Sequence, residues 1–268
     1  MILVGVDGSQ AGLAAVAWAA REAALRDVPL LVAHAMPRWA YETGCGPYAE
    51  VGAWLREGGR SVLEAAEERA GREQPKIAVD TTFLPDDPRT ALIAAADAAE
   101  LLVVGNHGVG GFRGMLLGSV AYGVAGHAPC DVVVVREPPL PQPEEIVAGV
   151  DGSPASYGVL EFAFKEARLR AARLRVVHAR LTHPGPSGPE ETPRHTGPVA
   201  ERYPDVALVE ESVHGHPVDV LLQAASRAAL LVAGSHGHRA FAGMVLGSVT
   251  HELLHRAPCP LAVVRSVR

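Results

Sequence analysis

The sequence predicts an α/β protein of two tandem domains, each a five-stranded parallel sheet of order 3-2-1-4-5 with helices on both faces. Short apolar runs alternate with segments of helical periodicity along the chain, which is the pattern of a parallel sheet covered on both sides. The stretch LLVVGNHGVGGFRGMLLGSV at 101–120 returns as LLVAGSHGHRAFAGMVLGSV at 230–249. The N-terminal pattern ILVGVDGS likewise returns as IVAGVDGS at 146–153. These two matches indicate an internal repeat.

The first half is expected to run β-α-β-α-β-α-β-α-β. Its elements, from strand to helix in turn, are 2–6, 10–26, 29–35, 60–71, 77–83, 88–98, 101–104, 119–127 and 131–135. Residues 38–59 mix aromatic side chains with glycines and a proline, and we expect a long loop there. Such a loop either covers a functional site or packs its own aromatic residues on the sheet edge.

A Pro-rich stretch, EPPLPQPEE at 137–145, separates the two halves. Proline breaks helices and interrupts sheet hydrogen bonding, so this stretch predicts a stiff linker. We therefore expect domains at 1–138 and 145–268, joined by a linker at 139–144. The second half begins again with a strand at 146–150, a helix to about 170 and a strand at 174–178. The offset between the repeats then falls from 144 to 129, so a reduced second helix is expected there.

Composition excludes several classes of protein. The 268 residues carry a net charge of −6, are 48% hydrophobic and 20% charged, and describe a globular chain without the basic face that a nucleic-acid binder needs. No apolar run is long enough for a membrane span, and the N-terminus is too short and uncharged for a signal peptide, so a cytoplasmic location is expected. The three cysteines form no CxxC pair, which argues against a disulfide framework or a structural zinc site.

The glycine-rich loop after the fourth strand suits an oxyanion. Gly105, Gly108 and Gly118 leave room for backbone N–H groups to converge, and Ser119 stands at the start of a helix, whose N-terminus attracts anions. A flexible strand-to-helix connection is the alternative. Retention of the same loop after residue 230 favours phosphate binding.

Asp7 follows the first strand and is retained as Asp151. In a sheet of order 3-2-1-4-5, strands one and four are neighbours where the winding reverses, and ligands bind beyond their carboxyl ends. Asp7 is therefore placed for a ribose hydroxyl or a phosphate-bound Mg²⁺, while the end of strand two offers backbone groups to a base. A helix cap is the alternative role for this aspartate.

These motifs resemble the universal stress protein family in its tandem, ATP-binding form. The ATP signature of that family, Gly-x2-Gly-x9-Gly-Ser/Thr, is matched twice, at Gly105, Gly108, Gly118 and Ser119 and at Gly234, Gly237, Gly247 and Ser248. The resemblance implies Rossmann-like (HUP-type) domains, each with an ATP site. It also implies that Asp7 and Asp151 contact ribose and Mg²⁺, that Ala35 and Ala179 contact adenine through their backbone, and that the N–H groups of Val120 and Val249 join the phosphate site.

The chain departs from the family at two places. Asn106 replaces the usual serine, and Gly110-Gly111 becomes Arg239-Ala240 in the second repeat. The second change either alters the phosphate geometry or brings Arg239 to a phosphate.

Motifs for efficient catalysis are missing. The sequence has no Gly-x4-Gly-Lys-Ser/Thr loop, no His-x-Gly-His and no Gly-x-Ser-x-Gly, and its two lysines, Lys76 and Lys165, lie outside the glycine loops. The pair His214 and His216 is a candidate metal-binding site, with a structural role as the alternative. The sequence therefore predicts binding without efficient turnover.

The leading hypothesis is an ATP-binding regulator of stress response or growth arrest, acting through an unknown protein partner. A slow ATPase or phosphotransferase using Asp7 and a metal is one alternative, and a scaffold with degenerate sites is the other. The repeat predicts a pseudo-two-fold pairing of the two domains through their fifth strands, and the family resemblance suggests a homodimer.

Overall fold

The computed structural model describes residues 1–42, 48–108, 117–136, 145–181, 196–237 and 245–265. The chain divides into two compact units, Met1–Pro138 and Pro139–Arg268. The expected linker at 139–144 lies outside the described residues, as do the Gly110-Gly111 and Arg239-Ala240 positions. Within the described part, no helix combines the length and apolarity needed to cross a bilayer.

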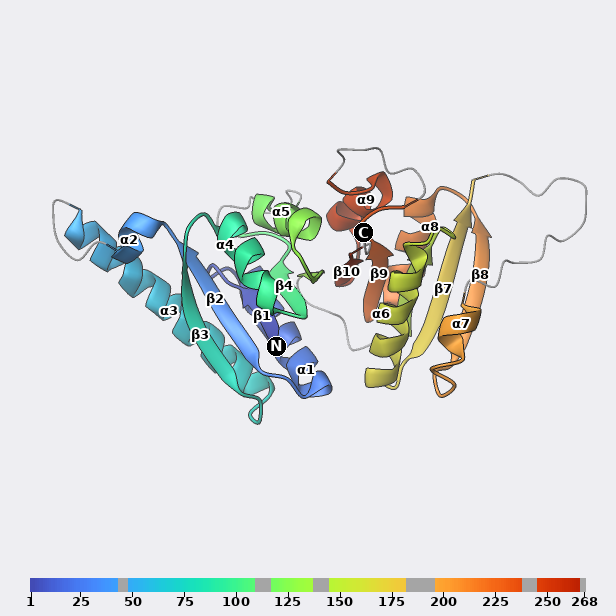
Figure 1. Cartoon of the computed structure of the whole chain (residues 1–268), viewed down its shortest axis with the longest axis horizontal. Coiled ribbons are helices and arrows are strands. Elements are labelled where there is room, and N and C mark those ends of the chain that lie inside the picture. Colours follow the sequence, from blue (N-terminus) through green and yellow to red (C-terminus); the bar gives the residue numbers. More distant parts are fainter. Residues whose placement is uncertain (43–47, 109–116, 137–144, 182–195, 238–244, 266–268) are drawn as a thin grey trace, which may run out of the picture. The chain divides into compact units, whose positions relative to one another are not determined.

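The first unit alternates strands and helices in the expected manner (Figure 1). Its elements are β1 (Ile2–Gly5), α1 (Gln10–Arg26), β2 (Leu30–Met36), α2 (Arg38–Glu42), α3 (Ala49–Glu73), β3 (Val79–Pro85), α4 (Pro88–Ala95), a 3-10 turn (Ala96–Ala98), β4 (Leu101–Gly105), α5 (Ser119–His127) and β5 (Asp131–Val135).

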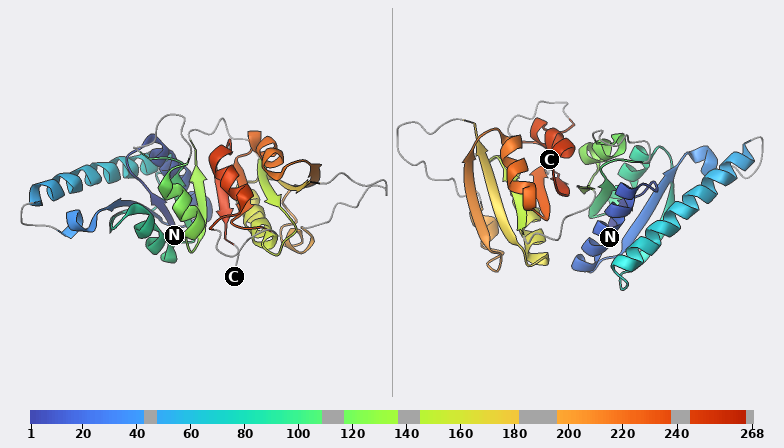
Figure 2. Two further views of the ribbon diagram at one scale, coloured as in Figure 1. Left: turned by 90° about the horizontal axis from the view of Figure 1, so that it is seen from above. Right: turned by 180° about the vertical axis from the view of Figure 1, so that it is seen from behind.

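The strands of this unit are parallel and lie in the order β3-β2-β1-β4-β5. Helices α1 and α3 pack against one face of the sheet, and α4 and α5 pack together on the other. Figure 1 shows α4 and α5 in front of the strands, and the right-hand view of Figure 2 shows α1 and α3 from behind. Since both faces are covered, the α/β class with a parallel sheet is confirmed here.

Burial explains why the central strands read as continuous apolar runs. Ile2, Leu3 and Val4 of β1 and the residues 101–103 of β4 have no exposed surface. A strand covered on both sides has no polar face, so its sequence does not alternate. Helix α1 begins where the Ser9 hydroxyl accepts the Gly12 N–H at 3.0 Å, which caps its first turn. Burial in the core thus determines the apolar sequence of the strands, and the Ser9 cap determines where the first helix begins.

The expected long loop at 38–59 is wrong, because this segment holds α2 and most of the first half of α3. One of its glycines serves close packing. A Cβ on Gly59 would lie 2.7 Å from Phe83 Cε1. The aromatic residues do not pack on the sheet edge either, since Trp39 and Trp54 are 45% and 74% exposed.

The second unit repeats the design with a shorter second helix. Its strands are parallel in the order β10-β9-β6-β7-β8, and α7 has only four residues. The elements are β6 (Glu145–Val150), α6 (Ser156–Leu169), β7 (Arg173–Arg180), α7 (Gly197–Ala200), β8 (Leu208–His214), α8 (Pro217–Ala224), a 3-10 turn (Ala225–Arg227), β9 (Leu230–Gly234), α9 (Ser248–Arg256) and β10 (Leu261–Val264). The reduced second helix is therefore confirmed among the described residues.

A buried ion pair occurs in both units. Glu22 has no exposed surface, and its Oε1 accepts from Arg26 Nε at 2.5 Å one turn further along α1. Glu166 and Arg170 form the same pair on α6. A buried carboxylate requires a charged partner, so each arginine balances the buried charge of the glutamate one turn before it.

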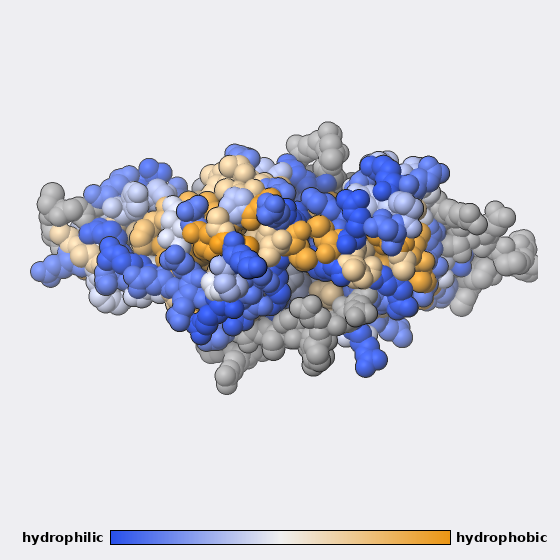
Figure 3. Space-filling view, turned by 90° about the horizontal axis from the view of Figure 1, so that it is seen from below, coloured by the Kyte–Doolittle hydropathy of each residue, from blue (hydrophilic) through white to orange (hydrophobic). Residues whose placement is uncertain are grey.

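The surface is mixed. Figure 3 shows one face of the molecule, on which hydrophilic residues cover much of the area and hydrophobic residues gather in smaller groups between them. Of the described cysteines, Cys130 and Cys259 are not joined by a disulfide, and Cys259 is buried.

Candidate functional site

The carboxyl ends of β1 and β4 bring the two repeated motifs together. The register pairs Gly5 with Val104, so the turns that follow these residues leave the same edge of the sheet. Ser9 Oγ donates to the His107 carbonyl at 3.5 Å across this junction. A Cβ on Gly108 would lie 2.4 Å from Asp7 Oδ2. The Asp7 carboxylate therefore lies directly against the backbone of the glycine loop, as the sequence predicts.

The turn after β1 holds this carboxylate in place. The Ser9 N–H donates to Asp7 Oδ1 at 3.0 Å, and Gly8 has φ +84°, a conformation that side chains rarely adopt. Gly152, its counterpart, has φ +77°. The Asp-Gly-Ser sequence is thus required by the turn itself, and the turn leaves Asp7 Oδ2 facing the loop.

Helix α5 begins at the same place. Gly118 precedes it in an extended conformation (φ −67°, ψ 149°), and its N–H donates to the Asn106 carbonyl at 2.7 Å. Asn106 N–H in turn donates to the Val135 carbonyl at 2.9 Å. These two bonds tie the start of α5 to the ends of β4 and β5. The first N–H groups of a helix have no partner within the helix, so Ser119 and Val120 present donors there.

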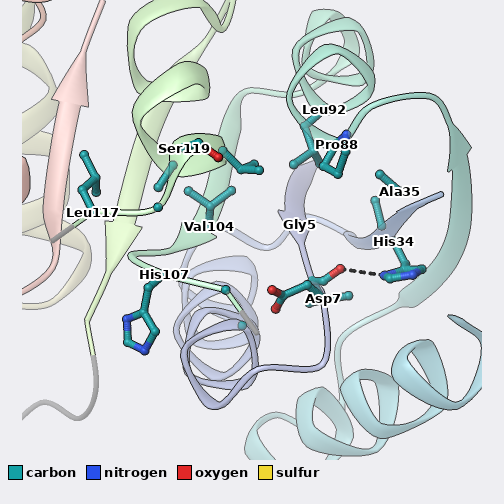
Figure 4. A pocket seen from close by; sticks show the side chains of 18 residues that line it. Gly5, Asp7, His34, Ala35, Pro88, Leu92, Val104, His107, Leu117 and Ser119 are labelled. Carbon is teal, nitrogen blue, oxygen red and sulfur yellow. Dashed lines mark hydrogen bonds between the residues drawn. The ribbon is translucent and has the colours of Figure 1, made fainter. Parts of the chain in front are cut away.

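A cavity of about 470 Å³ lies between these elements. It is lined by all seven site residues expected in the first repeat, namely Asp7, Ala35, Gly105, Gly108, Gly118, Ser119 and Val120. Figure 4 shows Asp7, His107 and Ser119 around it, with Pro88 and Leu92 of α4 forming an opposite side. Ligand pockets commonly measure roughly 300 to 1,000 Å³, so the space suits a small organic molecule.

One wall of the cavity is apolar, and sequence reasoning did not assign it. Leu92, Pro88 and Val104 line it. Leu92 reaches the sheet because Gly5 has no side chain: a Cβ there would lie 2.7 Å from Leu92 Cδ1. Gly149 and Leu221 repeat this contact at 2.8 Å in the second unit. The retained glycine–leucine pair was the signal that could have found this wall.

His34 adds a polar group at the end of β2, next to Ala35. Its Nδ1 lies 2.9 Å from the Val6 carbonyl oxygen. A carbonyl oxygen only accepts, so Nδ1 carries the proton and donates. The ring also meets the edge of Phe83 at 6.2 Å between centroids. His34 is therefore held rigidly beside the apolar wall.

The second unit places its motif residues in the same arrangement. A Cβ on Gly237 would lie 2.4 Å from Asp151 Oδ2, and the Gly247 N–H donates to the Ser235 carbonyl at 2.8 Å. Ser248 starts α9 after Gly247, which has φ −64° and ψ 150°. Gly234 ends β9, Val249 follows Ser248, and Ala179 lies near the end of β7.

Two hydrogen bonds distinguish the second site from the first. Asp151 Oδ1 accepts from the Ser156 hydroxyl at 3.0 Å, a position that is Gly12 in the first repeat. The Thr250 hydroxyl donates to the Gly234 carbonyl at 2.6 Å, where the first repeat has Ala121. The Ser156 and Thr250 hydroxyls thus give the second site two side-chain hydrogen bonds that Gly12 and Ala121 cannot make in the first.

The described lining of the first cavity has one carboxylate, Asp7, and neither lysine nor arginine. Within the described residues no three His, Cys, Asp or Glu side chains gather into a metal-binding cluster. Asp7 and Asp151 would thus need oxygens of a ligand to complete a Mg²⁺ site. His214 and His216 are exposed on either side of Gly215 where β8 ends, and metal binding there stays a prediction.

Comparison with known proteins gives consistent matches over the whole chain. A model of the universal stress protein family matches residues 1–136 and again 143–265. A universal stress protein of Mycolicibacterium smegmatis is 36% identical over 98% of this chain and 96% of its own length. One of Mycobacterium tuberculosis is 34% identical over the same shares. The crystal structure of a universal stress protein from Archaeoglobus fulgidus matches with a TM-score of 0.79 at 18% identity, covering 99% of this chain and 98% of that one, a likeness of fold.

Proposed function

The chain belongs to the universal stress protein family, and from that premise we propose that each of its units binds ATP with Mg²⁺ and that the protein acts as a nucleotide-dependent regulator. The observation that carries the proposal is the cavity in which Asp7, the glycine loop and the start of α5 meet. These three groups have the chemistry that a nucleoside triphosphate requires.

The parts of the cavity correspond to the parts of the ligand. Backbone donors at Gly108, Ser119 and Val120 would hold phosphate oxygens, as helix N-termini and glycine loops do for anions. The Asp7 carboxylate would accept a ribose hydroxyl or help to hold the Mg²⁺ that accompanies the phosphates. The apolar wall of Pro88 and Leu92, with the backbone of Ala35, would take the base.

We propose binding without efficient turnover, and the groups that line the cavity support this. Phosphoryl transfer is accelerated by cations placed on the β- and γ-phosphates and by a group that orients the nucleophile. The described lining offers no lysine or arginine, and Asp7 is its only carboxylate. We propose that occupancy of the sites, rather than hydrolysis, is the signal that a protein partner detects.

A slow ATPase that uses Asp7 and Mg²⁺ is the second candidate, because this carboxylate lies against the phosphate loop. The two candidates separate in one experiment. Nucleotide released from the denatured, purified protein is identified by chromatography, and turnover by the native protein is measured with and without Asp7→Ala. Bound ATP with no turnover supports the regulator. Multiple turnovers that Asp7→Ala abolishes support the enzyme, and turnover unchanged in that variant indicates a contaminating activity.

A further inference from the structure

Helix α9 of the second unit carries two histidines one turn apart. His251 and His255 lie on the same side of the helix, since residues four apart are neighbours on a helical surface. Their ring centroids are 4.9 Å apart with planes inclined at 54°, and both side chains are partly exposed. The two imidazoles are therefore close, not stacked flat, and within reach of solvent.

The ring separation matches the geometry of a shared metal ion. Zinc binds imidazole nitrogen at about 2.0 to 2.1 Å, which puts each ring centroid roughly 3.2 Å from the metal. Two such rings at a tetrahedral angle have centroids about 5 Å apart. The observed 4.9 Å is close to this value, so rotation of the two side chains would suffice to bring one nitrogen of each ring to a common ion.

The cationic residue next along the chain is already paired. Arg256 follows His255, and its guanidinium pairs with Asp219 at 3.3 Å and with Glu252 at 3.9 Å. The positive charge of Arg256 is therefore balanced by carboxylates, which lessens its repulsion of a bound cation.

The feature belongs to the second unit alone. At the repeat offset of 129, the positions of His251 and His255 are Tyr122 and Gly126 on α5. The two helices otherwise start in the same way, after Gly247 and Gly118, so the shared phosphate-loop design does not require the histidine pair.

We propose that His251 and His255 form a binding site for a borderline-soft divalent cation such as Zn²⁺, Ni²⁺ or Cu²⁺. Imidazole is a preferred ligand of these metals, whereas Mg²⁺ and Ca²⁺ prefer oxygen. Water completes the coordination, because no third His, Cys, Asp or Glu joins the pair within the described residues.

A bound cation would stabilise the helix that begins at the second glycine loop. The His251 N–H donates to the Gly247 carbonyl at 2.9 Å, so His251 is tied to the residue that precedes α9. A metal ion that joins His251 to His255 would also stabilise the next turn of α9. The site thus gives a transition metal a way to stiffen the start of α9 and not that of α5.

The test is calorimetric titration of the full chain, freed of nucleotide and metal, with Zn²⁺ alone at pH 7.5. One Zn²⁺ should bind, and His251→Gln or His255→Gln should each weaken it on the order of 100-fold, since two ligands on a rigid helix act together. His127→Gln removes an exposed histidine from α5 of the first unit, is the matched control and should bind as the wild type does. Because nucleotide is absent, the result is independent of ATP binding.

A second measurement uses the unaltered protein. Substoichiometric Cu²⁺ should broaden the amide NMR signals of α9 before those of α5. Zn²⁺ affinity unchanged in both α9 variants, loss of binding in the His127→Gln control instead, or broadening centred outside α9 would each overturn the proposal.

Discussion

Replacing Gly108 with alanine should weaken nucleotide binding more than it lowers the stability of the fold. The new Cβ would lie 2.4 Å from Asp7 Oδ2, whereas ordinary contacts between carbon and oxygen are about 3.3 Å or more. The carboxylate must therefore move by about 1 Å. Asp7 is exposed, so the move costs little beyond the hydrogen bond from the Ser9 N–H, about 1 kcal/mol of unfolding free energy.

The loss of affinity should be larger. A hydrogen bond to a charged group contributes about 1.5 to 3 kcal/mol, which corresponds to about a 10- to 150-fold rise in Kd for MgATP at the first site. Isothermal titration gives the Kd of each site, and urea unfolding followed by circular dichroism gives the stability. A variant that loses more than about 3 kcal/mol of stability while both sites bind MgATP as before would refute the reasoning.

Gly237→Ala is the matched variant in the second unit, with the same 2.4 Å approach to Asp151 Oδ2. Asp151 Oδ1 accepts from both Ser153 N–H and the Ser156 hydroxyl, so moving this carboxylate breaks two bonds. We expect Gly237→Ala to destabilise its unit by about 2 kcal/mol, more than Gly108→Ala does. Equal losses of stability in the two variants would show that the serine hydroxyl does not hold Asp151.

Three further predictions concern other positions. Gly118→Ala should weaken MgATP binding more than it lowers the melting temperature, because its Cβ would lie 3.3 Å from His107 Cα, a tight but tolerable contact; equal losses would make the glycine only a turn residue. Glu22→Gln should cost about 3 kcal/mol in urea unfolding, since it leaves the buried Arg26 without its carboxylate, and a loss below about 1 kcal/mol would contradict this. Gly105→Ala should lower the melting temperature of the first unit more than Gly234→Ala lowers that of the second. The Cβ on Gly105 would lie 2.7 Å from the backbone of α1, whereas the Cβ on Gly234 would lie 3.1 Å from its nearest neighbour. Thermal melts that rank the two variants in the opposite order would be inconsistent with this packing.

Glycines show why one part of the fold could not be predicted. At Gly8 a positive φ makes the residue a turn signal, and the sequence interpretation was right there. At Gly59 the residue lies inside α3, where the helix comes so close to Phe83 and His34 that no Cβ fits. A glycine chosen for close approach is indistinguishable in sequence from one chosen for a turn, so residues 38–59 were misread as a loop.

The core elements were predictable because burial dictates their composition. Strands such as β1 and β4 are apolar at every position since both faces are covered, and Gly118-Ser119 marks the start of α5. The helix that begins at Pro88 was predictable as well, because proline favours the first helical position and Asp87 Oδ1 accepts the Arg89 N–H at 3.1 Å. The boundaries of β3 shifted by two residues, from the expected 77–83 to Val79–Pro85.

The sequence analysis did not identify two residue pairs whose role depends on tertiary packing. Leu92 reaches Gly5 from a different segment of the chain, and the two together shape the apolar wall of the cavity. Glu22 and Arg26 lie on one helix, yet their burial depends on how α1 packs against the sheet. Both pairs recur in the second repeat, so comparing the repeats position by position would have marked them without showing what they contact.

The central claim is that both glycine loops hold ATP, and direct titration of the nucleotide-free chain with MgATP tests it. The account predicts saturable binding of two nucleotides per chain, with one of the two sites weakened by Gly108→Ala and the other by Gly237→Ala. No detectable binding at millimolar MgATP, or binding that neither variant changes, would contradict it.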